Sequence, residues 1–387
     1  MLYLGTLRGA YVSTDLGTTW TRITSLPRTR VTDLDFMPGI HLLGAGTMGW
    51  GGWAILTQAT PPTVNPPATQ TSVEGASHSF GLGSFSDPDG GPWTVDINWG
   101  DGTSHTSFTA NSPGPLPNKT HTYGEEGAYT VTIKVTDTLI DQSDSKTFTV
   151  NVSDPPVNAS GGFSFDANIN TDTGPQTLAT FTDPGGAEPN AFDPSPTGHY
   201  AASIAWGDGT SAGTITPATP SSPTQVFSVT GNHTYTIESP VSGFSVVTTI
   251  DHEGVTSTAT STAIVGRPGK VTGGGKIGDA RGFDVDVQPD KSNGFKGHLN
   301  YKDAANSVDL RSTSITFVSI LIDNKHATIK GTATVNGVSG YTFNVHVEDN
   351  GEPGKGVDRF RIEISGPTSY DSNSSLLTAG NVQAHKE

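Results

Sequence analysis

One five-residue sequence occurs twice in this 387-residue chain and limits what the chain can fold into. Trp99-Gly-Asp-Gly-Thr103 recurs, 107 positions later, as Trp206-Gly-Asp-Gly-Thr210. Two further pairs accompany it: His121-Thr-Tyr123 with His233-Thr-Tyr235, and Phe85-Ser-Asp-Pro-Asp-Gly90 with Phe181-Thr-Asp-Pro-Gly-Gly186. Because solenoid repeats run about 20–50 residues, a period this long indicates tandem domains.

The residues before the motif predict a half-buried strand that ends in a tight turn. Val95-Asp-Ile-Asn-Trp99 alternates, which places Val95, Ile97 and Trp99 on one face, toward a core. The glycines that follow accept positive φ, and the side chain of Asp101 can bond neighbouring backbone amides. We therefore interpret Asp101, and Asp208 in the second copy, as structural turn residues and not as catalytic carboxylates. His121 and His233 are interpreted as packing residues at strand ends.

The two copies differ in the length of one loop. Asp87 precedes Trp99 by 12 residues, whereas Asp183 precedes Trp206 by 23, so the second copy carries an 11-residue insertion around residues 190–199. Loop insertions change stability little, so this difference fits a β-sandwich core with variable connections.

The composition excludes several classes of function. The chain has 48 Gly and 26 Pro, and its Thr-, Ser- and Val-rich segments favour short strands joined by turns. It has no Cys, which excludes disulfides, thiolate zinc sites and cysteine nucleophiles. The formal charge of −16 argues against a nucleic-acid partner. No run of 18 apolar residues occurs, so membrane insertion is not expected.

The repeated residues resemble a known family. Trp99–Thr103, His121–Tyr123, Gly127-Ala-Tyr-Thr-Val131 and Val135-Thr-Asp137, in that order, are similar to the polycystic kidney disease (PKD) repeat, an immunoglobulin-like β-sandwich of secreted and surface-layer proteins. The second copy keeps the turn and His-Thr-Tyr but departs from the family pattern at Gly243-Phe-Ser-Val246 and Ile250-Asp-His-Glu-Gly254. The resemblance implies an extracellular location and a role in spacing, adhesion or substrate presentation. It implies structural roles for Trp99, Asp101, His121, Tyr123, Trp206, Asp208, His233 and Tyr235.

A second motif lies near the N-terminus. Ser13-Thr-Asp-Leu-Gly-Thr-Thr-Trp20 resembles the Asp-box of sialidase-like β-propellers, a hairpin turn in which Asp15 shapes the loop and Trp20 packs against its blade. One blade cannot close a propeller, which needs about four to eight, and it leaves sheet edges without partners. We therefore expect residues 1–57 to be a propeller remnant and the chain to be the C-terminal part of a longer protein. Any paired carboxylates of a glycosidase would then lie upstream.

The last segment has its own β pattern. Five runs alternate with period two: Phe283–Val287, Ser314–Ile320, His326–Val335, Tyr341–Val347 and Arg359–Ile364. Asn336-Gly337 between two of them predicts a hairpin. Gly269–Ile277, Val335–Phe343 and Asp349–Gly354 resemble an uncharacterised β-domain that ends some secreted bacterial repeat proteins, which implies a location and no activity.

Calcium is the one candidate cofactor. Some domains of the PKD family bind calcium, and the resemblance extends this hypothesis to Asp87, Asp89 and Asp137. Carboxylates on neighbouring loops supply the oxygen ligands that calcium prefers. The acidic loop Glu348–Asp358 gives a second candidate cation site, at Asp349, Glu352 and Asp358. A solvated turn is the alternative interpretation of that loop.

Together these features predict an all-β chain of tandem immunoglobulin-like β-sandwiches, a partial β-propeller blade and a C-terminal β-sandwich or barrel-like domain. The expected order is the blade at 1–57, a Pro-rich linker at 58–67, PKD-like sandwiches at 68–153 and 154–266, and the C-terminal domain at 267–387.

The sequence predicts no enzyme within these residues. It contains no Gly-x-Ser-x-Gly, His-Glu-x-x-His or phosphate-loop motif, so no catalytic residue is named. The favoured function is a non-catalytic spacer, adhesion or ligand-presenting region of a large secreted or cell-surface bacterial protein. Its expected partner is a polysaccharide or a cell-surface protein or glycan. The alternative is an accessory, carbohydrate-binding, C-terminal part of a secreted glycoside-degrading enzyme whose catalytic propeller lies upstream.

Overall fold

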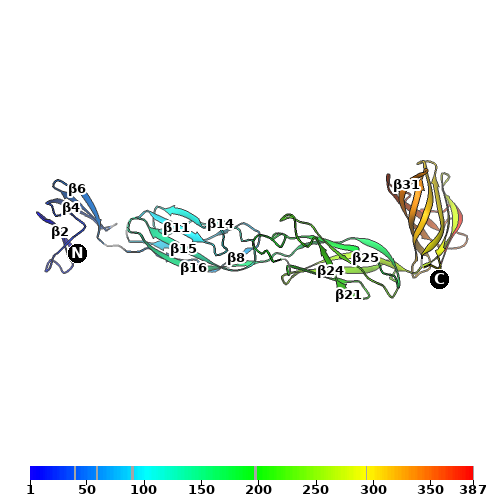
Figure 1. Cartoon of the computed structure of the whole chain (residues 1–387), viewed down its shortest axis with the longest axis horizontal. Coiled ribbons are helices and arrows are strands. Elements are labelled where there is room, and N and C mark those ends of the chain that lie inside the picture. The colour runs from blue at the N-terminus through cyan, green and yellow to red at the C-terminus, as the bar shows by residue number, and fades with distance from the viewer. Residues whose placement is uncertain (39–40, 58–59, 89–90, 196–197, 293, 387) are drawn as a thin grey trace. The chain divides into compact units, whose positions relative to one another are not determined.

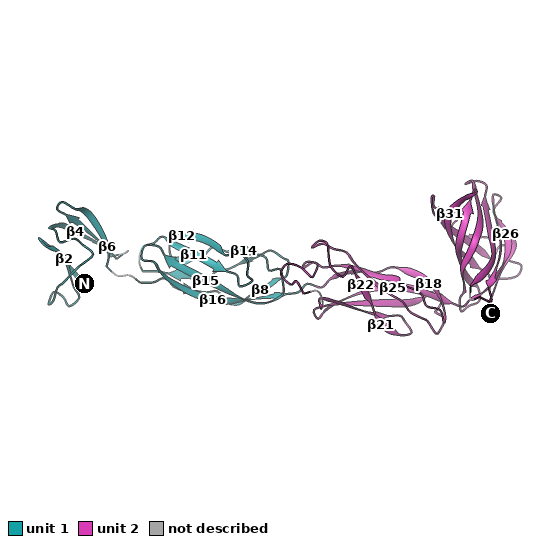
Figure 2. Cartoon of the chain, in the orientation of Figure 1, with its two compact units in different colours: residues 1–155 teal, residues 156–387 magenta. Residues whose placement is uncertain are grey.

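The computed structural model describes residues 1–38, 41–57, 60–88, 91–195, 198–292 and 294–386. Every regular element among them is a β-strand (Figure 1), which confirms the predicted all-β class. The described part of the chain contains no helix with the length and hydrophobicity that crossing a membrane requires. The chain divides into two compact units, residues 1–155 and 156–387 (Figure 2).

The N-terminal part of the first unit contains two antiparallel three-stranded sheets, ordered β1-β2-β3 and β4-β5-β6. Their strands are β1 (Leu2–Thr6), β2 (Gly9–Ser13), β3 (Thr21–Arg22), β4 (Val31–Met37), β5 (Leu42–Thr47) and β6 (Gly51–Leu56). A small core forms from Ala10, Leu26, Val31 and Ala45. A propeller blade is a single four-stranded sheet, so this region differs from one complete blade.

The rest of the first unit is a sandwich, here called sandwich 1. Its five-stranded sheet has the order β12-β11-β15-β16-β8, with β8 parallel to β16, and it faces the smaller sheets β13-β10-β7 and β14-β9. The strands are β7 (Thr63–Asn65), β8 (Gln70–Val73), β9 (His78–Phe80), β10 (Ser84–Ser86), β11 (Trp93–Asn98), β12 (Thr106–Ala110), β13 (Gly114–Pro115), β14 (Lys119–His121), β15 (Gly127–Asp137) and β16 (Gln142–Ser153).

The alternation in β11 and β15 is the one that the sequence predicts. Val95 and Ile97 of β11 are fully buried, as are Ile133 and Val135 of β15. Within the range expected to be a linker, residues 58–67, the strand β7 pairs with β10 of the sandwich, while residues 58 and 59 lie outside the described residues.

Sandwich 2, in the second unit, repeats this arrangement. Its five-stranded sheet has the order β21-β20-β24-β25-β18, with β18 parallel to β25, and its second sheet has the order β17-β19-β23-β22. The strands are β17 (Asn158–Ser160), β18 (Ser164–Asn168), β19 (Gln176–Thr182), β20 (Tyr200–Ala205), β21 (Thr210–Ala212), β22 (Thr214–Thr216), β23 (Phe227–Gly231), β24 (Phe244–His252) and β25 (Val255–Gly266). Strand for strand, the two five-stranded sheets have the same order and the same parallel edge strand.

The C-terminal domain is one antiparallel sheet ordered β33-β32-β31-β30-β29-β28-β27-β26-β35, with β34 also paired to β32, and it curls around its buried face (Figure 1). The strands are β26 (Gly269–Ile277), β27 (Arg281–Pro289), β28 (Phe295–Asp303), β29 (Val308–Ile320), β30 (His326–Val335), β31 (Val338–Glu348), β32 (Arg359–Ser365), β33 (Tyr370–Asp371), β34 (Ser375–Leu376) and β35 (Ala379–Lys386). Asn336 and Gly337 both have positive φ, 52° and 80°, and form the predicted hairpin between β30 and β31.

Candidate functional site

The repeated motif in sandwich 1 joins a turn to the opposite sheet. Asp101 Oδ1 accepts hydrogen bonds from the Thr103 amide at 3.0 Å and the Thr103 hydroxyl at 2.7 Å, and its Oδ2 lies 2.6 Å from His121 Nε2. The His121 ring stacks on buried Trp99 with centroids 4.5 Å apart and planes 2° from parallel. The Tyr123 hydroxyl donates to the Trp99 carbonyl at 3.1 Å. The motif thus fastens the turn after β11 to the residues around β14.

The carboxylate of this turn is held in its ionised form. Burial alone would raise the pKa of Asp101, but the hydrogen bonds from Thr103 and His121 outweigh it and lower the pKa below the usual 3.8. Both carboxylate oxygens therefore serve as acceptors within the motif. This arrangement holds the hairpin turn after β11.

Sandwich 2 repeats the same contacts. His233 Nε2 lies 2.6 Å from Asp208 Oδ1, and its ring stacks on buried Trp206 with centroids 5.0 Å apart. The Tyr235 hydroxyl lies 3.5 Å from the Trp206 carbonyl, longer than the corresponding contact in sandwich 1. The two sandwiches therefore share the Asp–His contact and the Trp–His stack, and the hydrogen bond from tyrosine is longer in sandwich 2.

At the other end of β11, sandwich 1 holds two of the residues proposed for calcium. Trp93, the first residue of β11, pairs in register with Asp137, and its indole N–H donates to Asp87 Oδ2 at 2.7 Å. Asp137 is buried, and its Oδ1 accepts the Leu139 amide at 2.8 Å. The structure thus brings Asp87 and Asp137 to one strand end, while Asp89 lies outside the described residues.

Sandwich 2 places different chemistry at the equivalent end. Tyr200 begins β20 six residues before Trp206, as Trp93 does before Trp99. Tyr200 pairs in register with His252, and its hydroxyl donates to Asp183 Oδ2 at 2.5 Å. Asp183 therefore takes the place of Asp87, and His252 takes the place of Asp137. A buried imidazole stands where sandwich 1 has a buried carboxylate.

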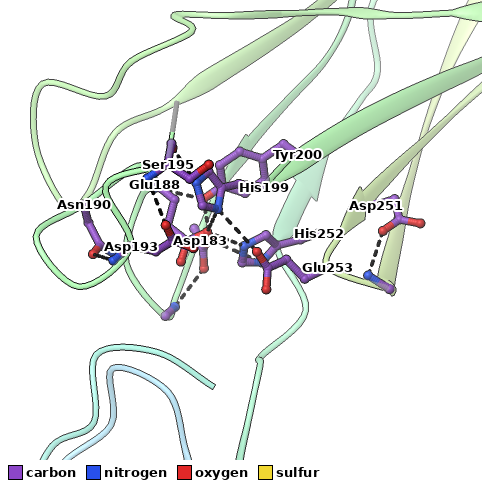
Figure 3. Close-up of polar contacts among 12 residues, drawn as sticks. Asp183, Glu188, Asn190, Asp193, Ser195, His199, Tyr200, Asp251, His252 and Glu253 are labelled. Atoms are coloured by element: carbon purple, nitrogen blue, oxygen red, sulfur yellow. Dashed lines mark hydrogen bonds and ion pairs between the residues drawn. The ribbon is translucent and has the colours of Figure 1, made fainter. Parts of the chain in front are cut away.

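The loop insertion and a hairpin complete this end of sandwich 2. The connection between β19 and β20, which contains the insertion, contributes Glu188 and His199, and the turn between β24 and β25 contributes Glu253. We call Asp183, Glu188, His199, His252 and Glu253 the histidine–carboxylate cluster; Figure 3 shows their side chains directed toward one another. All but Glu253 have buried side chains, and that of Glu253 is 27% exposed.

Glu188 lies between the two imidazoles of the cluster. Its Oε2 is 2.8 Å from His199 Nδ1 and 3.0 Å from His252 Nε2 (Figure 3). His199 Nδ1 is also 3.3 Å from Glu253 Oε1, and His252 Nδ1 is 3.4 Å from Asp183 Oδ2. The ligand atoms of Glu188, His199 and Glu253 all lie within 4.8 Å of one another, a spacing at which one metal ion can be held.

The carboxylates also shift the protonation of their neighbours. Burial alone would lower the pKa of His199, but the hydrogen bond to the Ser195 carbonyl and the charge of Glu188 outweigh it, so that the pKa is raised. Burial, together with the hydrogen bond to Asp183, raises the pKa of the Tyr200 hydroxyl. The cluster therefore attracts positive charge.

The second predicted cation loop is held to β35 by its carboxylates. Asp358 is buried. Its carboxylate accepts hydrogen bonds from the backbone amides of Asn350, Gly351 and Val382, at 2.9, 3.3 and 3.1 Å. Asp349 accepts the Ala384 amide at 3.1 Å, and Glu352 accepts the Asn381 side-chain amide at 2.9 Å. Burial raises the pKa of Asp349, and the nearby Asp358 and Glu352 charges add to this effect. Among the described residues, three sets of histidine and carboxylate side chains bring three ligand atoms within 4.8 Å of one another, as a metal site requires. Asp349, Glu352 and Asp358 belong to none of these sets.

The Asp-box segment forms a self-contained turn. Asp15 accepts the Ser13 hydroxyl at 2.7 Å, the Thr19 amide at 2.8 Å and the Thr19 hydroxyl at 2.6 Å. These bonds, led by that from the Thr19 hydroxyl, lower the pKa of Asp15 to about 2. Trp20 is 38% exposed and donates its indole N–H to the Gly17 carbonyl at 3.1 Å. The Trp20 indole is therefore bonded to its own turn. The resemblance to the Asp-box implies that it packs against a blade.

Sequence reasoning did not predict the histidine–carboxylate cluster. It noted Asp183 only as a repeat marker, residues 190–199 only as an insertion, and the segment that contains His252 and Glu253 only as a departure from the family pattern. The sequence did contain one signal. The insertion ends in His199 and follows Glu188, and the segment that departs from the family pattern contains His252 and Glu253. Only the strand register shows that the two segments meet.

The buried Trp–His stack and the strand order define sandwich 1 as an immunoglobulin-like β-sandwich. Residues 59–152 match the family described as PKD domain. No curated protein matches the chain.

Three solved structures are among those to which this chain is similar. An I-band fragment of titin is 10% identical, covers 85% of this chain and 99% of its own, and has a TM-score of 0.28. The ectodomain fragment of ICAM-5 is 11% identical, covers 87% of this chain and 82% of its own, and has a TM-score of 0.29. The fibronectin(III)-like modules of Clostridium thermocellum CbhA are 12% identical, cover 53% of this chain and 94% of their own, and have a TM-score of 0.18. Similarity at this level identifies no ligand or activity.

Proposed function

We propose that this chain is a non-catalytic spacer and ligand-presenting region of a large secreted or cell-surface bacterial protein. In this proposal sandwich 2 is a second PKD domain in tandem with the first. The observation that carries it is the shared construction of the two sandwiches: the same order of five strands, with the same Trp–His stack closed by an Asp. In each sandwich the motif side chains bond to the sandwich's own hairpin. A domain of this kind, present twice, is suited to act as a spacer between other parts of the protein.

The motif geometry favours a structural over a catalytic role. A general base needs a free lone pair directed at a reacting group. His121 and His233 instead stack on buried tryptophans and direct Nε2 at a carboxylate that the turn already uses. The Thr103 hydroxyl beside this pair in sandwich 1 donates to Asp101.

Exposed aromatic side chains supply the best surface for a glycan partner. Trp50 is 66% exposed in the segment that joins β5 to β6, and the indole N–H of Trp53 donates to its carbonyl at 3.1 Å. Aromatic rings combine a large apolar face with a polar edge, which suits them to binding surfaces that are partly wet.

A glycan array probed with the full chain, with release of reducing ends measured in parallel, tests the proposal. We expect retention on a polysaccharide or surface glycan without product, and weaker retention of Trp50→Ala. Asp101→Asn should leave retention unchanged. Release of product that Asp101→Asn or Asp208→Asn abolishes would contradict the proposal.

The alternative is an accessory region of a secreted glycoside-degrading enzyme. The observation that favours it is the Asp-box turn of residues 13–20, formed with its full set of Asp15 hydrogen bonds. The gene sequence upstream of residue 1 distinguishes the two. Further Asp-box blades with a carboxylate pair would favour the enzyme, and further sandwich repeats would favour the spacer.

A further inference from the structure

The histidine–carboxylate cluster concentrates negative charge in a buried place. Asp183, Glu188 and Glu253 contribute three carboxylates, and His199 and His252 are the two bases among them. Counted by formal charge, three carboxylates and two protonated imidazoles leave one net negative charge. Isolated buried charges are strongly unfavourable, so a buried group of this kind is normally matched by counter-charge or by a metal ion.

The orientation of His199 is the one that a metal ligand requires. Its Nε2 lies 2.8 Å from the Ser195 carbonyl, which can only accept a hydrogen bond, so Nε2 carries the hydrogen. In the neutral ring the lone pair is then on Nδ1, which faces Glu188 and Glu253. Metal-bound histidines almost always donate their other N–H to a carbonyl or carboxylate in this way.

The spacing of the three donor atoms fits a small ion after a minor adjustment. Zinc–ligand bonds of about 2.0–2.2 Å in a tetrahedron place neighbouring ligand atoms roughly 3.4 Å apart. His199 Nδ1 is 2.8 Å from Glu188 Oε2 and 3.3 Å from Glu253 Oε1. Opening the shorter contact by about half an ångström gives the tetrahedral separation. Partly exposed Glu253 leaves a route for the ion to enter.

Glu253 is placed at the cluster by an unusual backbone conformation. It begins the two-residue turn Glu253–Gly254 between β24 and β25 with φ of 49°, and Gly254 follows with φ of 94°. Such turns favour Asn, Asp or Gly at this position. From this position the Oε1 atom of Glu253 comes within 3.3 Å of His199 Nδ1.

The contrast with sandwich 1 indicates which class of ion the cluster would select. The equivalent strand end of sandwich 1 offers Asp87 and Asp137, oxygen donors suited to calcium or magnesium. Sandwich 2 adds imidazole nitrogen, a donor that suits zinc and its neighbours among the transition metals. The chain has no Cys, so nitrogen and oxygen are the donors on offer.

We propose that the histidine–carboxylate cluster of sandwich 2 binds one divalent transition-metal ion of the zinc class, with Glu188, His199 and Glu253 as ligands. His252 is a positioning residue, because its Nε2 lies 3.0 Å from Glu188 Oε2 and its Nδ1 faces Asp183. The ion would join the insertion loop to the β24–β25 hairpin. The assignment stands apart from the spacer function, which requires no metal.

Titration of the metal-free full chain with zinc chloride in a calorimeter tests the proposal. We expect one equivalent to bind, and cobalt bound in its place to give the visible absorption of a four-coordinate site. His199→Gln and Glu253→Gln should each weaken zinc binding by at least about 100-fold, and His252→Gln, an outer partner, by about 10–100-fold. His298→Gln is the matched control, since His298 forms an exposed pair with Asp284 at 2.8 Å in the C-terminal domain and should leave affinity unchanged.

Three results would overturn the assignment. These are no saturable zinc binding by the unmodified chain, an affinity that survives both His199→Gln and Glu253→Gln, or calcium binding as tight as zinc. Thermal unfolding of each metal-free variant checks that sandwich 2 is intact. Glu253→Gln keeps the test valid if His199→Gln fails to fold, because Glu253 is partly exposed on a hairpin turn.

Discussion

The matched tyrosines of the two sandwiches give a prediction whose size follows from one distance. Tyr123 and Tyr235 are both fully buried, and each directs its hydroxyl at the carbonyl of the motif tryptophan. The separation is 3.1 Å in sandwich 1 and 3.5 Å in sandwich 2. Hydrogen bonds between oxygens are usually about 2.5–3.0 Å long, so the first is near that range and the second is well outside it.

Replacing each tyrosine with phenylalanine removes the hydroxyl and keeps the ring. The ring contacts of Tyr123 with His121 at 4.7 Å and Tyr129 at 4.3 Å therefore persist. A buried hydrogen bond contributes about 0.5–1.5 kcal/mol, so Tyr123→Phe should lower the unfolding free energy of sandwich 1 by about 1 kcal/mol. Tyr235→Phe should change that of sandwich 2 by less than about 0.5 kcal/mol.

Hydrogen exchange of the slowest amides in β15 and β24 reports the unfolding free energy of each sandwich within the full chain. In a thermal scan, 1 kcal/mol corresponds to a shift of about 4–8 °C for a domain of this size. Equal losses in the two variants, or a larger loss for Tyr235→Phe, would refute the link between the hydroxyl–carbonyl distance and stability.

Two further predictions concern single carboxylates. The pKa of Asp101 lies below its usual 3.8, so its stabilisation is present above that pH and is lost as the pH falls through the lower folded-state value. Acid titration from about pH 5 to about pH 2, followed by circular dichroism, should thus destabilise sandwich 1 less steeply in Asp101→Asn than in the unmodified chain. A steeper loss in the variant would contradict this. Asp358→Ala leaves three backbone amides without their acceptor and should destabilise the C-terminal domain by about 3 kcal/mol in thermal denaturation. Asp309→Ala, which removes an exposed carboxylate 3.7 Å from Arg311, is its control and should change stability by less than about 0.5 kcal/mol.

The elements with strong local signals were predictable from the sequence. Period-two alternation gave β11 and β15, and Asn336-Gly337 gave the hairpin between β30 and β31, because side-chain alternation and positive φ are local properties. The interpretation of Pro-rich residues 58–67 as a spacer missed β7. Three residues, Thr63–Asn65, are too few to show a period, and their pairing with β10 depends on residues about 20 positions away.

The histidine–carboxylate cluster was beyond local reasoning for a different reason. Glu188 and His252 lie 64 residues apart and meet only because Tyr200 pairs with His252 and the insertion folds back over that strand end. No fixed spacing marks such a site, in contrast to Trp99-Gly-Asp-Gly-Thr103, which is a contiguous sequence that occurs twice. Comparing the two copies position by position would have shown that His252 replaces Asp137.

Pulling the full chain by its two ends tests the spacer account most directly. A spacer must keep its domains folded under load, so the account predicts a separate force peak for each sandwich. At about 3.3 Å per extended residue, residues 63–153 and 158–266 correspond to roughly 300 Å and 360 Å of released chain. Extension without a resolved peak for either sandwich would contradict the claim that these two domains hold a distance.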